Sequence, residues 1–214
     1  MNTLSARASR VLDRLARPFL LRYREATAAQ RVLPGFIIIG TQKGGTTSLF
    51  HYLAQHPDLL PSYRKEVHYF DGGLRPGRDN FDRGEGWYRS NFPRRTLLEN
   101  GKQAFEASPL YIFHPLAPAR MHALLPDVRL ILLLRDPVER ALSHYFHQSR
   151  KGRERLPVAE AMAREEERLA PALAAGDYKH RHFSLFSYKL RGHYAEQIRR
   201  YRQYFRPEQM MVMG

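Results

Sequence analysis

Short apolar runs alternate along this chain with segments in which apolar residues recur at helical spacing. The run at residues 36–39 is too short and too β-branched for a helix, and residues 128–134 are almost continuously apolar. Runs of this kind are typical of strands buried on both faces of a parallel sheet. Further strands are expected at residues 65–70, 103–107 and 209–213.

Helical patterns lie between most of these strands. The first is expected to begin at Thr46 and to end before His56-Pro57-Asp58. The others are expected at residues 87–92, 115–125, 137–148, 158–173, 184–190 and 193–205. A run of glutamates, residues 165–167, is expected on a solvated helix face. The alternation predicts an α/β fold, a P-loop-like parallel sheet flanked by helices on both faces.

The turn after residues 36–39 is rich in glycine and threonine: Gly40-Thr41-Gln42-Lys43-Gly44-Gly45-Thr46-Thr47. Backbone amides that converge at a strand-to-helix turn, together with the positive end of the helix dipole, form a cradle for phosphate. A Walker A loop places lysine directly after its last glycine. Here Thr46 holds that position and Lys43 lies three residues earlier. We therefore expect an anion-binding loop that differs from Walker A in the placement of its lysine.

A second polar turn follows the longest apolar run, where Arg135 leaves the strand and Ser143 comes two helical turns later. Arginine can bind a phosphate monoester through two parallel hydrogen bonds, and a hydroxyl can add another. In open parallel sheets, ligands bind at the carboxyl ends of the strands. Lys43, Glu66, Ser108 and Arg135 each lie at or just after an expected strand, so we expect them on one rim.

Length and composition favour one folded domain with an anionic partner. We expect a leader at residues 1–33 and an α/β domain at residues 34–214. The formal net charge of +14 suits an anionic ligand, because a basic cleft raises the local anion concentration. The absence of cysteine excludes disulfides, Cys–zinc sites and thiol catalysis, and it fits a reducing compartment. No apolar run approaches the roughly 18 residues that a membrane span needs.

The leader is basic and partly amphipathic. Its apolar face would be formed by Val11, Leu12, Leu15, Phe19 and Leu20. The basic residues around that face are Arg10, Arg14, Arg17, Arg22 and Arg24. A helix packed on the domain, a loosely ordered leader and a peripheral membrane anchor all fit this pattern. We expect a cytoplasmic protein, with membrane association through the leader as the alternative.

The two polar turns resemble the nucleotide motifs of one enzyme family. Residues 40–47 resemble the 5′-phosphosulfate loop of sulfotransferases that use 3′-phosphoadenosine 5′-phosphosulfate (PAPS), and residues 133–143 resemble their 3′-phosphate motif. Residues 65–71 resemble the catalytic strand of the heparan sulfate N- and 3-O-sulfotransferase branch and its bacterial relatives. Residues 106–109 resemble a further active-site segment of that branch, and residues 192–197 a later helix. The likeness runs from about residue 35 to residue 214, and the two nucleotide motifs in this order are highly specific.

The resemblance implies direct transfer of a sulfuryl group from PAPS to a hydroxyl or amine, with a carbohydrate or glycolipid as the expected acceptor. The nucleotide-binding residues that it implies are Gln42, Lys43, Gly44, Gly45, Thr46, Thr47, Arg135 and Ser143. Lys43 would also neutralise charge on the departing phosphate. Glu66 would take the proton from the acceptor, with help from His68. Asp71 and Ser108 would contact the acceptor.

A sulfuryl group carries less negative charge than a phosphoryl group, so the magnesium that kinases need should be dispensable. We expect no metal, and no nucleic acid as a partner. Two departures from the family pattern stand out. Ala107 replaces a lysine that glycan 3-O-sulfotransferases often carry, which weakens the expectation of an acidic glycan. The chain also ends at Gly214 as a strand begins, so we expect the C-terminal part of the fold to be truncated.

Two other classes of protein remain open. A P-loop nucleotide kinase or NTPase would share the strand, loop and helix, but it would need a lysine at residue 46 and an acidic residue to hold magnesium. A non-catalytic module that binds polyanions could use the arginines and aromatic residues interleaved at positions 194–206. A solvated helix face explains that pattern more simply.

Overall fold

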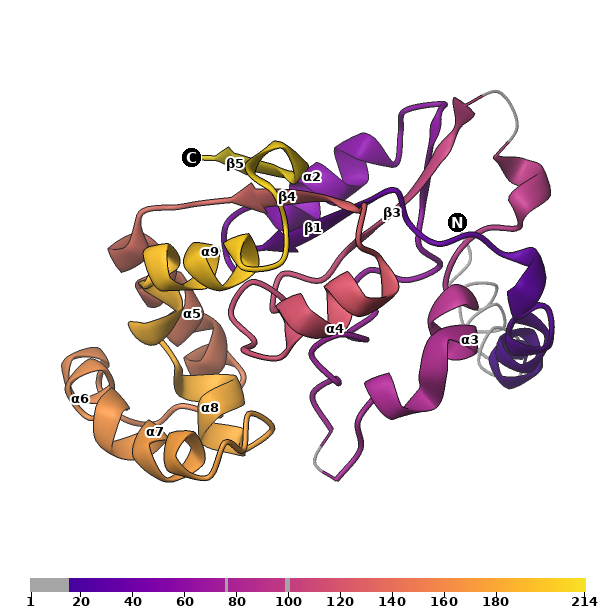
Figure 1. The fold of residues 1–214 in the computed structure, drawn as a ribbon. Coiled ribbons are helices and arrows are strands. Elements are labelled where there is room, and N and C mark those ends of the chain that lie inside the picture. Colours follow the sequence, from indigo (N-terminus) through magenta and orange to yellow (C-terminus); the bar gives the residue numbers. More distant parts are fainter. Residues whose placement is uncertain (1–15, 76, 99–100) are drawn as a thin grey trace, which may run out of the picture.

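The computed structural model describes residues 16–75, 77–98 and 101–214, in which five parallel strands form one sheet (Figure 1). The strands are β1 (Phe36–Gly40), β2 (Leu59–Pro61), β3 (Gln103–Ala107), β4 (Arg129–Leu133) and β5 (Met210–Met213). Their order across the sheet is β2-β3-β1-β4-β5, and each neighbouring pair is parallel. The central strand is therefore β1, the first of the predicted apolar runs, with β4 beside it.

The helices of the described residues are α2 (Thr46–Leu53), α3 (Gly84–Arg89), α4 (Ala117–Leu124), α5 (Pro137–Arg150), α6 (Val158–Ala163), α7 (Glu165–Ala174), α8 (Arg181–Phe186) and α9 (Tyr194–Arg202). On one face of the sheet, Phe50 of α2 packs with Ile38 and Phe105. On the other face, Met121 of α4 and Tyr201 of α9 belong to the main core. The expected α/β fold with helices on both faces is confirmed.

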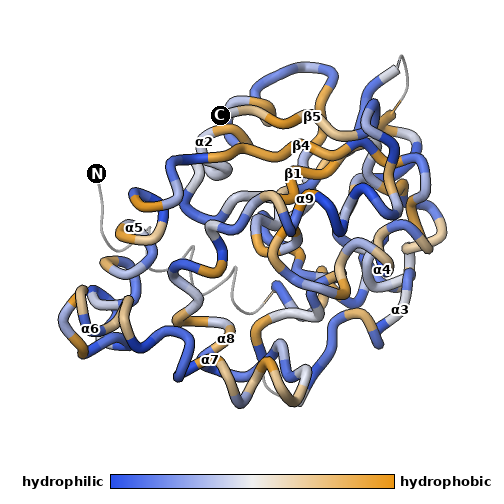
Figure 2. Tube along the Cα trace, turned by 60° about the vertical axis from the view of Figure 1, so that its left-hand side comes forward, coloured by the Kyte–Doolittle hydropathy of each residue, from blue (hydrophilic) through white to orange (hydrophobic). Residues whose placement is uncertain are grey.

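Strand β1 is buried along its whole length. Alternate side chains of β1 enter the two cores, because successive residues of a strand point to opposite faces. The ring of Phe36 stacks on that of Phe105 in the neighbouring strand, with 5.0 Å between the centroids. The apolar character of β1, β4 and β5 is visible in Figure 2. This rigid centre carries the turn that follows β1.

The segment at residues 65–70, expected as a strand, is irregular, and β2 occupies the position beside β3. Glu66 and His68 have φ angles of 62° and 55°, in the left-handed region that breaks an extended chain. The backbone N–H of His68 donates to the hydroxyl of Ser108 at 3.3 Å, and that of Tyr69 donates to the hydroxyl of Tyr111 at 2.9 Å. Side-chain hydroxyls thus replace the carbonyl partners of a regular strand.

The expected helix at residues 158–173 is divided into α6 and α7 at Arg164. Glu165, expected on a solvated face, is instead buried. Its carboxylate accepts hydrogen bonds from the backbone N–H groups of Lys189 at 2.6 Å and Leu190 at 2.8 Å. The expectation was wrong for Glu165 because its carboxylate binds the backbone amides at residues 189 and 190, far along the chain. Glu166 and Glu167 are exposed, as expected.

Residues 1–15, which include part of the expected amphipathic leader, lie outside the described residues. Residues 16–26 form a helix. Within it, Arg24 donates to the carbonyl oxygens of Ser90 and Phe92, at 2.7 and 2.9 Å, which ties this helix to the domain. Phe19 remains 73% exposed. None of the helices in the described ranges is both long and apolar enough to cross a bilayer.

Candidate active site

The turn between β1 and α2 has the features of an anion cradle. Gly45, the N-cap of α2, has a φ of 89°, and no side chain caps the helix. A Cβ atom on Gly44 would lie 3.0 Å from the carbonyl oxygen of Thr41 and 3.1 Å from that of Leu133, so this position has little room for a side chain. Among the described residues, the backbone N–H groups of Gly45, Thr46 and Thr47 have no hydrogen-bond partner. They are available to an anion.

Lys43 lies in this turn with a φ of 72° and a half-buried side chain. Burial lowers the pKa of its ammonium group, and the positive charges of Arg150, Lys151 and Arg135 lower it further. The charge of Glu66 opposes this shift, but the carboxylate of Glu66 is already paired with Lys65 at 2.7 Å. Several cations therefore converge here without a matching number of carboxylates, an arrangement that an anionic ligand would stabilise.

Arg135 brings the second motif to the same turn. Its Nη1 donates to the main-chain carbonyl oxygen of Lys43 at 3.1 Å, and its Nη2 lies 3.1 Å from a carboxylate oxygen of Glu139. The side chain of Asp136 accepts from the first backbone amides of α5, which fixes the start of that helix. Ser143 lies one turn beyond Glu139 on the same side of α5 and is partly buried.

Gln42, expected to bind the nucleotide, has another partner in this structure. Its side-chain oxygen accepts from Nη1 of Arg191. Arg191 is almost fully buried, and burial together with the nearby charge of Arg140 lowers its pKa to about 9. Nothing in the local sequence signalled this residue, because it follows Gln42 by 149 positions. A buried guanidinium beneath the loop adds to the positive potential at the anion cradle.

Glu66, His68 and Asp71 form a hydrogen-bonded chain beside this loop. Nδ1 of His68 lies 2.6 Å from Oδ2 of Asp71, and its Nε2 lies 3.3 Å from Oε2 of Glu66. Burial alone would lower the pKa of His68, but the two carboxylates raise it to about 10. The hydrogen bond from His68 lowers the pKa of Glu66 to about 2, with a further contribution from Lys65 at 2.7 Å. The arrangement holds an ionised Glu66 against a protonated His68.

Two residues expected to contact an acceptor are buried. Asp71 is 1% exposed, and its second carboxylate oxygen accepts from the backbone N–H of Gly73 at 2.9 Å. Ser108 is fully buried, and its hydroxyl donates to Glu106 at 3.3 Å. Both residues support the Glu66–His68 segment from within the protein. Their direct contact with an acceptor stays a prediction.

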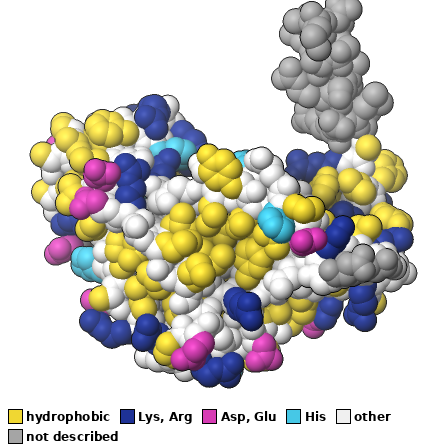
Figure 3. Space-filling model, turned by 90° about the horizontal axis from the view of Figure 1, so that it is seen from above, with side chains coloured by type: hydrophobic (Ala, Val, Ile, Leu, Met, Phe, Trp, Pro, Cys, Tyr) yellow, Lys and Arg dark blue, Asp and Glu magenta, His cyan; other side chains and the backbone are white. Residues whose placement is uncertain are grey.

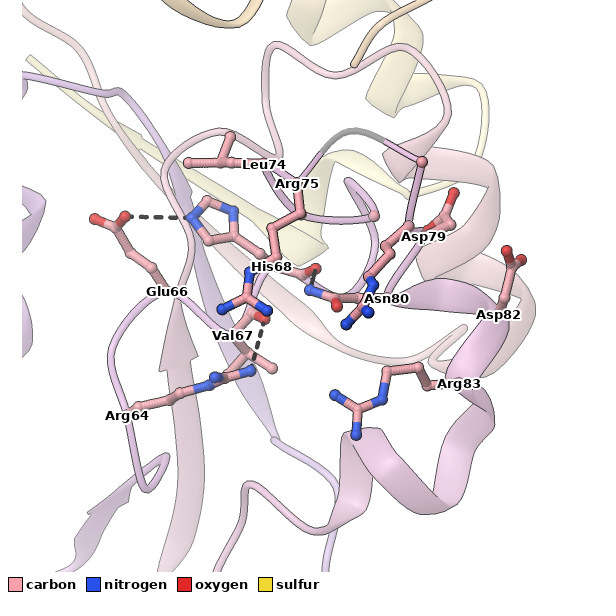
Figure 4. A pocket seen from close by; sticks show the side chains of 14 residues that line it. Arg64, Glu66, Val67, His68, Leu74, Arg75, Asp79, Asn80, Asp82 and Arg83 are labelled. Atoms are coloured by element: carbon pink, nitrogen blue, oxygen red, sulfur yellow. Dashed lines mark hydrogen bonds and ion pairs between the residues drawn. The ribbon is translucent and has the colours of Figure 1, made fainter. Parts of the chain in front are cut away.

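A cleft of about 750 Å³ opens beside Glu66 and His68 (Figure 4). The guanidinium groups of Arg64, Arg75 and Arg83 point into it. The carboxylate of Asp79 on its wall is already paired with Arg120 at 2.9 Å. Within the described ranges, no group of three or more histidine, aspartate and glutamate side chains has the arrangement of a metal site.

Basic side chains are not confined to this cleft. Figure 3 shows lysine and arginine side chains at several edges of the face seen from above, around a central apolar area. At residues 194–206, Tyr201 and Phe205 are buried in the core. Of the other two aromatic residues in that segment, Tyr194 is partly buried and Tyr204 is 40% exposed, so half of the aromatic side chains are withdrawn from the surface. This disfavours the alternative of a polyanion-binding face built from this helix.

Residues 33–214 match the family described as Sulfotransferase domain. The membrane-associated sulfotransferase kil1 of Dictyostelium discoideum is 45% identical over 113 residues, which make up 53% of this chain and 22% of that protein. Heparan sulfate glucosamine 3-O-sulfotransferase 6 of Homo sapiens is 40% identical over 116 residues, 54% of this chain and 31% of that protein. The matches thus span less than a third of these relatives.

A solved structure, a sulfotransferase from Alicyclobacillus acidocaldarius, is 35% identical and superposes with a TM-score of 0.64. That match covers 85% of this chain and 73% of the other. The expected resemblance to sulfotransferases is confirmed, and the nucleotide-binding role of the two turns stays a prediction. The chain belongs to the sulfotransferase domain family.

Proposed function

We propose that this protein transfers a sulfuryl group from PAPS to a hydroxyl or amine of an acceptor. The observation that carries the proposal is the contact between Arg135 and the backbone of Lys43, which joins two anion-binding motifs at one rim of the sheet. A nucleotide with phosphate groups at both its 5′ and its 3′ positions matches two such motifs. Family membership supports the same donor.

The residues of the loop fit this nucleotide. The unpaired amides of Gly45, Thr46 and Thr47 would hold the 5′-phosphate, which the positive end of α2 also attracts. Arg135 would exchange part of its pairing with Glu139 for the 3′-phosphate, and Ser143 would add a hydroxyl. The 3′-phosphate is the group that separates PAPS from ATP.

In the reaction, the acceptor oxygen attacks sulfur while Glu66 takes the proton of the hydroxyl. The bond between sulfur and the bridging oxygen breaks, and its electron pair stays on the departing 5′-phosphate. Lys43 would stabilise that charge, because its ammonium group is not neutralised by the protein. His68, held by Asp71, orients the carboxylate of Glu66. The products are the sulfated acceptor and 3′,5′-bisphosphoadenosine.

The acceptor would enter through the cleft beside Glu66. Its polar lining, rich in arginine, suits a hydroxylated and partly anionic molecule such as a carbohydrate. The relatives named for heparan sulfate favour the same class of acceptor. Ala107, where glycan 3-O-sulfotransferases often carry lysine, leaves the identity of that carbohydrate open.

Labelled sulfate tests this function directly. The protein is incubated with PAPS labelled at sulfur and with separate pools of glycans, glycolipids and small alcohols, in the presence of EDTA. We expect label in a carbohydrate pool with the wild type and its loss with Glu66→Gln. Transfer of phosphate from ATP in magnesium, without sulfate transfer from PAPS, would identify a kinase instead.

We also propose peripheral membrane contact through the N-terminal segment. Phe19, Leu20 and Tyr23 are exposed on the helix at residues 16–26, beside Arg17 and Arg22. An exposed apolar face with flanking arginines favours an anionic membrane surface. Sedimentation with phosphatidylserine vesicles should be stronger for the wild type than for Phe19→Ser; equal sedimentation would exclude this contact.

A further inference from the structure

The most unusual polar group behind the proposed catalytic residues is Glu106. It is the fourth residue of β3, and its side chain is 0% exposed. It lies on the same face of the sheet as the aromatic core of Tyr69, Phe70 and Tyr88. A carboxyl group at such a position is costly unless its oxygens are satisfied. The proposed reaction gives it no part.

Both oxygens of Glu106 accept hydrogen bonds from hydroxyl groups. The hydroxyl of Tyr88 donates to Oε1 at 2.8 Å, and that of Ser108 donates to Oε2 at 3.3 Å. Ser108 in turn accepts from the backbone N–H of His68 at 3.3 Å. A hydroxyl has one proton and two lone pairs, so Ser108 donates to Glu106 while its oxygen accepts from His68, and the bond to Glu106 fixes the orientation of that hydroxyl.

This chain of bonds ends at a strained backbone. Glu66 and His68 both adopt the left-handed conformation, which is unfavourable for residues with a side chain and persists only when the surroundings hold it. The fixed points are the carbonyl oxygen of Ala107, which accepts from the N–H of Glu66 at 2.9 Å, and the hydroxyl of Ser108. Glu106 precedes both of these residues at the end of β3, and its carboxylate contacts the second point directly through the hydroxyl of Ser108.

We infer that Glu106 is a positioning residue, which through Ser108 holds the backbone of His68 and thereby the Glu66–His68 pair in its reactive geometry. The inference rests on the proposed function for its catalytic consequence. It needs the carboxylate form, because a protonated Glu106 would have only one oxygen that accepts freely. The neutral acid would then compete with Ser108 for the role of donor.

The state of Glu106 is sensitive to pH near neutrality. Burial raises its pKa to about 7, although the neighbouring hydroxyl groups of Tyr88 and Tyr111 lower it. The titratable and charged groups that face it from the packed elements are Asp71, His68, Arg64, Tyr88, Tyr111 and Tyr201. Because the carboxylate is the active form, kcat is expected to rise as the pH increases through about 7.

The principal test is Glu106→Gln, which keeps the shape but offers one acceptor oxygen instead of two. We expect kcat to fall about tenfold, the loss of one buried hydrogen bond, with the Kd for 3′,5′-bisphosphoadenosine unchanged. The rise of kcat near pH 7 should disappear. Glu208→Gln, the same change at an exposed position, should behave as the wild type. A wild-type kcat and pH profile in Glu106→Gln would overturn the inference.

Ser108→Ala is the second variant, in case Glu106→Gln does not fold. It should lower kcat without raising the KM of the acceptor, and adding Glu106→Gln should lower kcat no further. A raised acceptor KM with an unchanged kcat would mean that Ser108 contacts the acceptor, and the positioning role would be wrong.

Amide hydrogen exchange gives a readout that needs no acceptor. The N–H of His68 should exchange about tenfold faster in Glu106→Gln or in Ser108→Ala than in the wild type, since its hydrogen-bond partner is weakened or lost. Unchanged exchange in the variants would contradict the inference even if no sulfate transfer were found. If the wild type transfers no sulfate but the His68 amide exchanges faster in the variants, only the proposed function would be wrong.

Discussion

The Nη1 atom of Arg135 lies 3.1 Å from the main-chain oxygen of Lys43, although 92 residues separate them in sequence. The contact joins the turns that follow β1 and β4, which are neighbours in the sheet. It places a guanidinium next to the turn at residues 40–47 rather than across the molecule from it. A nucleotide phosphorylated at both ends could therefore touch both motifs.

Lys43→Ala should lower kcat about a hundredfold or more, because a preorganised charge at the departing oxygen is lost. Nucleotide binding should weaken less, since the backbone amides of the loop remain. Initial rates of sulfate transfer, with calorimetric binding of 3′,5′-bisphosphoadenosine, measure the two effects. Lys102→Ala, at the opposite end of the sheet beside β3, is the control and should match the wild type.

Glu66→Gln should lower kcat by about 10²- to 10⁴-fold, the usual contribution of a positioned general base. The Kd of the nucleotide should stay within about twofold, because the turn at residues 40–47 is untouched. Steady-state kinetics and titration calorimetry on the same preparations check both parts. An unchanged kcat would assign the proton transfer to another group.

The His68–Asp71 pair predicts a pH-dependent stability. The folded-state pKa of His68, about 10, lies above its ordinary value of 6.5, so its stabilising contribution is complete below pH 6.5 and is lost as the pH rises toward 10. Urea unfolding of the wild type and of His68→Gln should therefore differ most at pH 6 and least at pH 10. A difference independent of pH over this range would mean that His68 is uncharged in the folded protein.

Gly40 is required by packing. A Cβ atom there would lie 2.4 Å from Cγ2 of Ile112 and 3.0 Å from Cδ1 of Leu132. Gly40→Ala should destabilise the fold by about 1–3 kcal/mol through overpacking. Gly86→Ala is the matched control, since its nearest contact would be 3.9 Å away at Ala28. If urea unfolding gave the two variants equal free energies of unfolding, the side chains around Gly40 would have room to accommodate a methyl group.

Much of this fold could be predicted from the sequence because local patterns dominate in its centre. The apolar runs of β1 and β4 favour a buried parallel sheet, and the glycines after β1 favour a tight turn, since Gly45 has a φ of 89°. The strand predicted from the alternation at residues 65–70 was wrong. The backbone there binds the hydroxyls of Ser108 and Tyr111, and such distant contacts cannot be read from a local pattern.

The site was predictable where chemistry follows directly from a motif. Lys43, Glu66, His68 and Arg135 lie on segments whose residue types carry the signal, and the structure brings them to one region. Glu106 and Arg191 were missed as functional candidates, because their importance depends on contacts across the fold. The local sequence around a buried charged residue does not show which distant groups it contacts.

The most direct measurement is calorimetric titration of 3′,5′-bisphosphoadenosine and of adenosine 5′-phosphate, in EDTA, into the wild type and Arg135→Ala. The account predicts that Arg135→Ala weakens binding of the bisphosphate about ten- to a hundredfold and leaves binding of the monophosphate unchanged. Arg129→Ala, at the opposite end of β4, should alter neither. Equal weakening of both nucleotides, or no binding of the bisphosphate by the wild type, would contradict a site in which Lys43 and Arg135 bind the two ends of one nucleotide.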